Sequence, residues 1–296
     1  MPELPEVETT VLDLKTKVLK RTFIDVWTDD SKIIKKPESF EKFKKELKRK
    51  KIKNIRRRGK NILIDLSDDK TLLIHQKMTG HLLLGKWKLE KGQWVSEIPG
   101  SLRDDPKNRF LHVIFFFDNG EQLALSDLRK FAKIELWDKN ELETSKIFKD
   151  LGPEPLEKEF TFGRFKDILK KKGRIKQALL DQKNIAGIGN IYSSEILWEA
   201  RVNPFKDVKE LKEREMREIY KAIKKILKKG INLKGDSFSD FRRLDGTKGD
   251  FNEWARVYKR EGGKCLRCKT AIKRKKLGGR SSYFCPKCQP MPRLKT

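Results

Sequence analysis

Cys265-Leu266-Arg267-Cys268 and Cys285-Pro286-Lys287-Cys288 form two Cys-x2-Cys pairs near the C-terminus, with an x16 spacing between them. Each pair places two thiolates on one side of a tetrahedral ion, and two pairs at this spacing are typical of a four-cysteine zinc site. Nothing in the spacing indicates an open coordination position. We therefore expect one structural zinc ion, which replaces a hydrophobic core that so small a module cannot build.

The segment around these cysteines is strongly basic. Residues 256–296 contain 14 Lys and Arg residues against one acid, Glu261, which gives a local net charge of +13. Gly278-Gly279-Arg280-Ser281-Ser282 lies between the two cysteine pairs. Glycines allow a tight hairpin turn, and Arg presents a planar fork of donors to a phosphate or a base. A hairpin with Arg280 at its tip is the prediction, and a solvated charged tip is the alternative.

The whole chain shares this basic character. Its 296 residues carry 71 Lys and Arg against 43 Asp and Glu, so the formal net charge is 71 − 43 = +28. The charge is spread along the chain, which favours nucleic acid over a membrane surface as partner; lysine enrichment through compositional drift is the alternative. No stretch approaches the ~20 apolar residues of a membrane span. All four cysteines belong to the one cluster, which suits a reducing cytoplasm.

The first half of the chain has the pattern of a β-rich domain. Residues 2–18 have helical spacing of apolar groups, and a second amphipathic helix is expected at about 39–50. Short β-type segments with turn residues between them predict an antiparallel sandwich. These segments are Phe23–Trp27, Asn61–Leu66, Thr71–His75, Leu111–Phe117 and Ala132–Trp137.

The second half is predicted to be helical. Gly152-Pro153-Glu154-Pro155 has the composition of a linker, and length alone favours two domains. Helices are expected at about 161–171, 174–182, 190–200 and 208–229. The last has an apolar stripe that we interpret as core. The stripe comprises Leu211, Ile219, Ile223, Ile226 and Leu227.

Two further features suggest chemistry. Pro2-Glu3-Leu4-Pro5-Glu6 follows the initiator Met, and removal of Met1 would expose a secondary amine with a pKa of about 8, able to attack a carbonyl-like carbon near neutral pH. The acids beside it do not resemble a signal peptide. Gly187-Ile188-Gly189-Asn190 leads into the helix at 190–200, where free backbone N–H groups form a candidate anion site; an ordinary turn is the alternative.

In this order, the motifs resemble the formamidopyrimidine-DNA glycosylase family from residue 2 to about 289. The resemblance implies an α+β multidomain fold that binds DNA in the cleft between its halves. Its N-terminal domain (1–140) would consist of a helix and a β-sandwich, followed by a linker (141–158). A helix–two-turn–helix domain with a lesion-recognition loop (159–254) and a β-hairpin zinc finger (255–296) would complete the chain. The motifs are Pro2-Glu3-Leu4-Pro5-Glu6-Val7-Glu8-Thr9, Arg57-Arg58-Gly59-Lys60, Leu151 to Leu156, Leu180-Asp181-Gln182 through Gly187 to Tyr192, and Val257-Tyr258 through the cysteines.

The resemblance also assigns catalytic roles. Pro2 would attack C1′ of the damaged nucleotide, displace the base and form a Schiff base. Glu3 would move protons during base loss and sugar opening. Lys60 would assist β-elimination and contact phosphate, and Arg280 would bind phosphate and support δ-elimination. Glu6 fits a supporting acid, although the helix dipole explains an acid there equally well.

Further residues match the family's DNA contacts. Met78, Arg129 and Phe131 would fill the gap left by the extruded nucleotide. The DNA backbone would be held by His112, Lys172, Lys176 and Asn190. Residues 237–246 resemble the loop that closes over the everted base, and Gly235, Gly246 and Gly249 bracket it as hinges would.

The chain departs from the family pattern in four places. His75-Gln76-Lys77-Met78-Thr79-Gly80 replaces the usual His-Leu-Gly-Met-Ser-Gly, and Asp127-Leu128-Arg129-Lys130-Phe131-Ala132 replaces Asp-Pro-Arg-Arg-Phe-Gly. The segment before His112 also differs, so that contact is less well supported. Residues 82–108 form a longer connection than expected. None of these changes removes a catalytic group.

Three hypotheses follow. The favoured one is a monomeric, cytoplasmic bacterial enzyme at the nucleoid, a glycosylase and lyase acting on oxidised or ring-opened purines in duplex DNA, such as 8-oxoguanine opposite C. An enzyme of the endonuclease VIII type would prefer oxidised pyrimidines, but that type generally has Gly where this chain has Leu4. A zinc-ribbon protein that binds nucleic acid without chemistry would have no need of Pro2, Glu3 and Lys60.

Overall fold

The structure, a computed structural model, describes residues 1–170, 173–238 and 240–291. These residues form two compact units. The first comprises Met1–Lys149 and Ile231–Asn252, and the second comprises Asp150–Gly230 and the chain from Glu253 onward. The predicted DNA contact Lys172 lies outside the described residues. The expected lesion-recognition loop, residues 237–246, falls within Ile231–Asn252 and so belongs to the same unit as the N-terminus.

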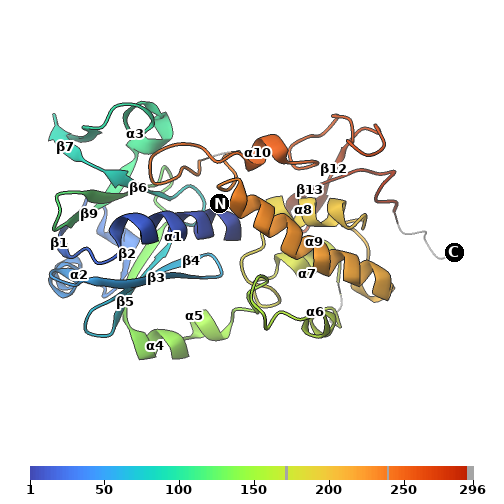
Figure 1. Cartoon of the computed structure of the whole chain (residues 1–296), viewed down its shortest axis with the longest axis horizontal. Coiled ribbons are helices and arrows are strands. Elements are labelled where there is room, and N and C mark those ends of the chain that lie inside the picture. Colours follow the sequence, from blue (N-terminus) through green and yellow to red (C-terminus); the bar gives the residue numbers. More distant parts are fainter. Residues whose placement is uncertain (171–172, 239, 292–296) are drawn as a thin grey trace. The chain divides into compact units, whose positions relative to one another are not determined.

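The first unit is built on helix α1 (Leu4–Val18) and two β-sheets (Figure 1). One sheet has the order β1-β9-β10-β6 and the other β2-β11-β5-β4-β3. Their pairings are antiparallel except for β2, which runs parallel to β11. The strands are β1 (Phe23–Thr28), β2 (Ile34–Lys36), β3 (Ile52–Arg58), β4 (Asn61–Leu66), β5 (Lys70–His75), β6 (His81–Gly85), β9 (Leu111–Phe117), β10 (Gln122–Ser126) and β11 (Lys133–Asp138).

A single core lies between the sheets and α1. Strand β9 shows why: Val113, Phe115 and Phe117 point into this core, while Ile114 and Phe116 point to the opposite face of the sheet. This alternation follows from the two-residue period of a strand. Helix α1 contributes an apolar stripe at helical spacing to the same core, made of Val7, Val11, Leu14 and Val18. The predicted helix and sandwich are confirmed.

The long connection 82–108 folds onto the outer face of the first sheet. It contains β7 (Trp87–Glu90), β8 (Gln93–Ser96), helix α3 (Ser101–Asp104) and the 3-10 turn η2 (Pro106–Arg109). Strands β7 and β8 form an antiparallel hairpin. Trp87 and Leu102 are buried there against Ile114, in a small core separate from the one between the sheets. The sequence patterns predicted neither the hairpin nor this second core.

The remaining elements of the first unit are short. Helix α2 (Phe40–Leu47) lies within the predicted helix, and the Ser39 hydroxyl caps it by accepting the Lys42 N–H at 3.3 Å. The others are η1 (Ser31–Ile33), α4 (Lys139–Thr144) and α5 (Lys146–Lys149). Helix α10 (Phe251–Trp254) begins where the first unit ends.

The second unit contains the predicted helices and the hairpin. Its elements are α6 (Phe162–Ile168), α7 (Ile175–Leu180), α8 (Asn190–Glu199), η3 (Val208–Glu210), α9 (Glu213–Asn232), β12 (Lys273–Leu277) and β13 (Arg280–Phe284). The helix expected from 208 is interrupted, because the Asp207 side chain closes η3 by accepting the Lys209 N–H. Leu211, which we expected in the apolar stripe of the helix, is buried but lies before the first residue of α9. In the part of the chain that the structure describes, no helix is long and apolar enough to cross a membrane.

Candidate active site and nucleic-acid interface

The N-terminal residues are fixed by a carboxylate on α1. Pro2 and Glu3 are buried, and Glu3 is the N-cap of the helix. Glu6 Oε2 accepts the Glu3 backbone N–H at 2.7 Å, and Glu6 Oε1 accepts the Asp236 backbone N–H at 2.9 Å. Gly235 has φ +81, and a Cβ there would lie 3.0 Å from Glu6 Cγ. The Glu6 side chain therefore connects Glu3, the neighbour of the predicted nucleophile Pro2, to Asp236, which directly precedes the 237–246 segment.

Lys60 occupies a tight turn between β3 and β4. Arg58 pairs with Asn61 across the two strands, so Gly59 and Lys60 are the central residues of a two-residue hairpin. Gly59 has φ +58, which suits the first central position of a type II′ turn. Lys60 is only 7% exposed. The predicted catalytic lysine is thus held by its backbone at a defined position rather than lying on a flexible strand end.

A histidine that the sequence analysis did not single out lies near Lys60. Burial, and then the charges of Lys77, Lys133 and Lys60, lower the pKa of His75 to about 3. Its Nδ1 accepts the Lys77 backbone N–H at 3.0 Å. The neutral ring must then carry its proton on Nε2, which is a hydrogen-bond donor. The position of His75 at the end of β5, just before the Met78 loop, was the sequence signal that could have found it.

The three predicted void-filling residues belong to two loops that one carboxylate holds together. Asp127 is fully buried; it accepts hydrogen bonds from the Thr79 hydroxyl and from the Ala132 N–H, the latter at 2.7 Å. Thr79 Oγ1 in turn accepts the Arg129 N–H at 3.2 Å.

The side chains on these loops face solvent. Met78 is 43% exposed and Phe131 is 50% exposed. The Arg129 guanidinium lies over the Phe131 ring, 4.5 Å from its centroid. Large exposed apolar side chains beside a cation suit insertion into a base stack. The loops that carry Met78, Arg129 and Phe131 are therefore joined at Asp127, and the void-filling role of these three residues remains a prediction.

His112 lies at the start of β9 beside an acid. Its Nδ1 is 2.9 Å from Asp29 Oδ1, and since a carboxylate only accepts, Nδ1 carries a proton. His112 is 8% exposed, and its Nε2 has no hydrogen-bond partner among the described residues. Asp29 therefore fixes the ring and leaves the second nitrogen for another group.

Two of the predicted DNA contacts of the second unit, Lys176 and Arg280, lie at the finger hairpin. Lys176 Nζ donates to Ser194 Oγ on α8 at 3.0 Å and to the Ser281 carbonyl on β13 at 3.1 Å. Gly278 and Gly279 have φ of +54 and +75, as a type I′ turn requires, and Arg280 follows them with an exposed side chain. Lys176 is almost completely buried, so in this structure it braces the hairpin.

Asn190 begins α8, directly after the glycine loop. Its side chain is half-buried, and its Oδ1 has no hydrogen-bond partner among the described residues. The anion site that the sequence suggested at this loop remains a prediction.

The four cysteines are placed for one metal ion. Their sulfur atoms lie within 4.8 Å of one another, with Cys265 and Cys288 at 3.9 Å and Cys268 and Cys285 at 3.3 Å. Tetrahedral zinc with Zn–S bonds of about 2.3 Å needs sulfur separations of about 3.8 Å. The cluster fits a four-cysteine structural zinc site.

Two buried polar side chains bind the finger to the helices of its unit. Glu195 on α8 accepts the backbone N–H groups of Arg256, Val257 and Tyr258 at 2.8 to 3.0 Å. Burial raises the pKa of Glu195, although these hydrogen bonds oppose the shift. Gln289 donates to the Val202 carbonyl at 2.8 Å. The metal module is therefore anchored in part through buried hydrogen bonds to backbone groups.

The described residues thus form a sandwich with a buried proline at position 2, a helical unit and a four-cysteine hairpin. Three family models match the chain in order. They are the formamidopyrimidine-DNA glycosylase N-terminal domain at residues 1–134, its H2TH domain at 151–242, and the zinc finger found in FPG and IleRS at 262–290. The chain belongs to the formamidopyrimidine-DNA glycosylase family.

Curated relatives agree over the whole length. The formamidopyrimidine-DNA glycosylase of Pelotomaculum thermopropionicum is 44% identical over 98% of this chain and 99% of its own. That of Carboxydothermus hydrogenoformans is 40% identical over 98% of this chain and 100% of its own. The resemblance found in the sequence is confirmed.

Solved structures show the same fold bound to DNA. A mutant of the Lactococcus lactis FPG, in complex with a Fapy-dG containing DNA, is 33% identical and matches with a TM-score of 0.85 over 98% of this chain and 100% of its own. The wild-type L. lactis protein in complex with an oxidised pyrimidine containing DNA matches with a TM-score of 0.84 at the same identity and coverage. This chain is accordingly a member of that family with one structural zinc site.

Proposed function

We propose that this protein excises oxidised or ring-opened purines from duplex DNA, as a monomer, and then cleaves the strand as a lyase. The observation that carries the proposal is the arrangement at the N-terminus. Pro2 directly precedes the cap of α1, and Glu6 fixes the Glu3 backbone that follows it. Removal of Met1 would turn the Pro2 nitrogen into a secondary amine at the start of a rigid helix.

The first reaction is base displacement. The Pro2 nitrogen attacks C1′ of the damaged nucleotide, the C1′–N9 bond breaks, and the base leaves with its bonding electrons and takes up a proton. The sugar ring then opens, and its O4′ takes a proton while C1′ and the Pro2 nitrogen form an iminium ion. Glu3, the N-cap of α1, would move these protons.

The second reaction is strand cleavage. The iminium ion acidifies C2′, so loss of a C2′ proton expels the 3′-phosphate by β-elimination. Loss of the C4′ proton then expels the 5′-phosphate by δ-elimination. Lys60 and Arg280 would stabilise the departing phosphates, and hydrolysis of the remaining imine would free Pro2.

Phosphate binding would use donors in both units. In the first unit, the His75 Nε2–H and the cations around it, Lys60, Lys77 and Lys133, form a basic group suited to a phosphate. In the second unit, the side chains of Asn190 and Arg280 offer similar donors. Met78, Arg129 and Phe131 would occupy the gap in the stack.

Oxidised pyrimidines are the second candidate substrates. The observation that favours them is the match to the L. lactis protein in complex with an oxidised pyrimidine containing DNA. Leu4 in the first turn of α1 favours the purine branch in this chain.

A substrate panel tests the proposal. Duplexes with 8-oxoguanine opposite C, a formamidopyrimidine, an oxidised pyrimidine or no lesion are incubated with the protein, and released bases and strand ends are measured separately. Faster release of purine lesions, with phosphate at both ends of the gap, is expected. Faster release of pyrimidines would assign the second candidate. Base release with an intact strand would remove the lyase step, and no release from any duplex would leave a DNA-binding protein.

A further inference from the structure

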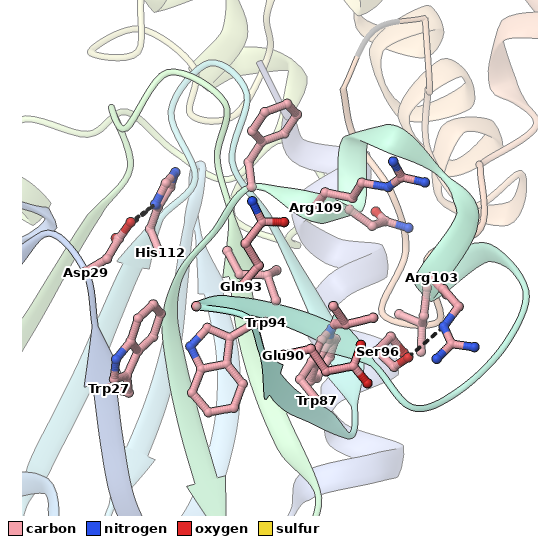
Figure 2. Close-up of a pocket in the computed structure, with 16 residues that line it drawn as sticks. Trp27, Asp29, Trp87, Glu90, Gln93, Trp94, Ser96, Arg103, Arg109 and His112 are labelled. Atoms are coloured by element: carbon pink, nitrogen blue, oxygen red, sulfur yellow. Dashed lines mark hydrogen bonds and ion pairs between the residues drawn. The ribbon is translucent and has the colours of Figure 1, made fainter.

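A pocket of about 780 Å³ lies in the first unit, outside the predicted catalytic residues (Figure 2). It lies between the outer face of β1 and β9 on one side and the β7–β8 hairpin with η2 on the other. Its volume falls in the range of small-ligand sites. In Figure 2, Trp27 lies below the His112–Asp29 pair, Trp94 lies beside Trp27, and Arg103 and Arg109 lie toward the other side of the pocket.

The aromatic side chains are arranged for stacking. Trp27 and Trp94 have ring centroids 5.4 Å apart with an interplanar angle of 65°, and both are half-buried. Trp94 also lies 6.1 Å from the Phe116 ring, which holds it on the sheet. A half-buried indole beside open pocket space offers a surface on which a flat base can stack.

Buried polar atoms in the pocket lack partners. Trp87 is 3% exposed and His112 is 8% exposed, yet Trp87 Nε1 and His112 Nε2 have no hydrogen-bond partner among residues 1–170, 173–238 and 240–291. The same holds for Trp94 Nε1. Leaving such groups unsatisfied costs free energy, which a ligand with polar edges would recover. A nucleobase has both acceptors and donors on its edges.

The charge of the lining favours an anion. Its two acids are already paired, since Asp29 contacts His112 at 2.9 Å and Glu90 contacts Lys88 at 2.8 Å. Arg103 is exposed and donates its Nε to the Ser96 carbonyl at 3.0 Å. Arg109 is also exposed. A nucleotide would place its base on the indoles and its phosphate near a guanidinium.

The pocket is continuous with the predicted DNA-contacting loop. The Phe110 carbonyl, on the rim, accepts the Asp127 backbone N–H at 2.8 Å. Lys130, between Arg129 and Phe131, lies 3.6 Å from Asp29. We propose that this pocket binds an unstacked nucleotide of the same DNA, one in a single-stranded segment next to the lesion duplex. The inference rests on the proposed function, because DNA held at Arg129 and Phe131 is what brings a flanking nucleotide to the pocket.

Tailed duplexes test this inference. The probes are an 8-oxoguanine duplex with blunt ends, the same duplex with a thymidine tail at each of its four ends in turn, and a thymidine oligonucleotide alone. 5-Iododeoxyuridine in the tail or oligonucleotide allows photocross-linking, and mass spectrometry then locates the adduct. Trp94→Ala and Arg109→Gln alter the pocket, and Trp137→Ala is the matched control, a half-buried tryptophan outside it.

We expect adducts on Trp27 or Trp94, and at least one tail should tighten binding about tenfold, the effect of one stacked base. Trp94→Ala and Arg109→Gln should lose this gain while keeping wild-type excision on the blunt duplex. Trp137→Ala should keep both. Adducts only elsewhere, or an undiminished tail effect in both pocket variants, would overturn the inference. Cross-linking of the thymidine oligonucleotide requires no lesion. It therefore tests the pocket even if the protein excises no base and the proposed function fails.

Discussion

The carboxylate of Glu6 accepts the backbone N–H of Asp236 at 2.9 Å, across 230 positions of the chain. Its other oxygen accepts the Glu3 N–H at 2.7 Å. The start of α1 and the beginning of the 237–246 segment are thus joined through one buried side chain. A change in Glu6 should affect both of them together.

Glu6→Gln should remove one of these acceptors and weaken the other. Hydrogen bonds to charged groups contribute about 1.5–3 kcal/mol each, so the free energy of unfolding should fall by about that amount. The excision rate should fall as well, because Glu3 and the 237–246 segment lose their common support. Urea denaturation and single-turnover excision measure the two effects. Glu41→Gln, an exposed acid in the first turn of α2, is the control and should stay within about 0.5 kcal/mol of wild type. Equal effects of both substitutions would contradict the role of Glu6.

Asp127→Asn should separate the Met78 loop from the Arg129 loop. Asp127 accepts hydrogen bonds from Thr79, Arg129 and Ala132, and an amide oxygen can replace only some of them. We expect kcat/KM on lesion duplexes to fall about tenfold or more, since misplaced inserting groups lose transition-state binding. Asp118→Asn, at an exposed hairpin turn, serves as control. Wild-type kcat/KM in Asp127→Asn would show that the two loops need no common support.

The stability of the first unit should fall in acid. Burial lowers the pKa of His81 to about 4 and that of His75 to about 3, against about 6.5 in the unfolded chain. Between these values the unfolded chain binds more protons, so the free energy of unfolding decreases as pH falls from about 6.5 toward 4, by up to about 1.4 kcal/mol per pH unit for each histidine.

Melting temperatures between pH 7.5 and 4.5 test this pH dependence. His81→Gln should flatten the dependence, and the double variant with His75→Gln should flatten it further. An unchanged slope in the double variant would mean that other groups cause the loss of stability in acid.

Removal of zinc should disrupt the finger hairpin. Two chelated cysteine pairs hold β12 and β13 beside α8, where Lys176 contacts the Ser281 carbonyl. We expect one zinc ion per chain by metal analysis, and Cys268→Ser should lose it together with most of the DNA affinity. Met291→Ser, an exposed position beyond the last cysteine, is the control. Full DNA affinity in a zinc-free Cys268→Ser protein would show that the finger is not part of the interface.

Much of the fold could be predicted because its periodicity is local. The stripe on α1 and the alternation in β9 each occur within one segment and specify which face is buried. Strand β3 was not predicted because its arginines are paired by acids on other elements. Arg57 pairs with Glu8 on α1 at 2.7 Å, and Arg56 pairs with Asp65 on β4 at 2.9 Å. The β7–β8 hairpin was not predicted for a related reason: its tryptophans pack against a sheet formed elsewhere in the chain, where Trp87 is buried and Trp94 is half-buried.

The site was predicted in part, and through short motifs. Cysteine spacing alone indicated the metal site, and the glycine pair before Arg280 indicated the hairpin turn. His75 was overlooked because Lys60 and Lys133, whose charges help to lower its pKa, come from other parts of the chain, the β3–β4 turn and β11. The roles predicted for Pro2, Glu3, Lys60 and Arg280 depend on chemistry with DNA, and they remain predictions until the reaction is measured.

The most direct test of the central claim is sodium borohydride trapping followed by mass spectrometry of the N-terminal peptide. With 8-oxoguanine opposite C, protein lacking Met1 should form a covalent DNA adduct on the Pro2 nitrogen, and protein that retains an N-terminal extension should form none. An adduct on a lysine in place of Pro2, or equal trapping with and without the extension, would contradict the proposed mechanism.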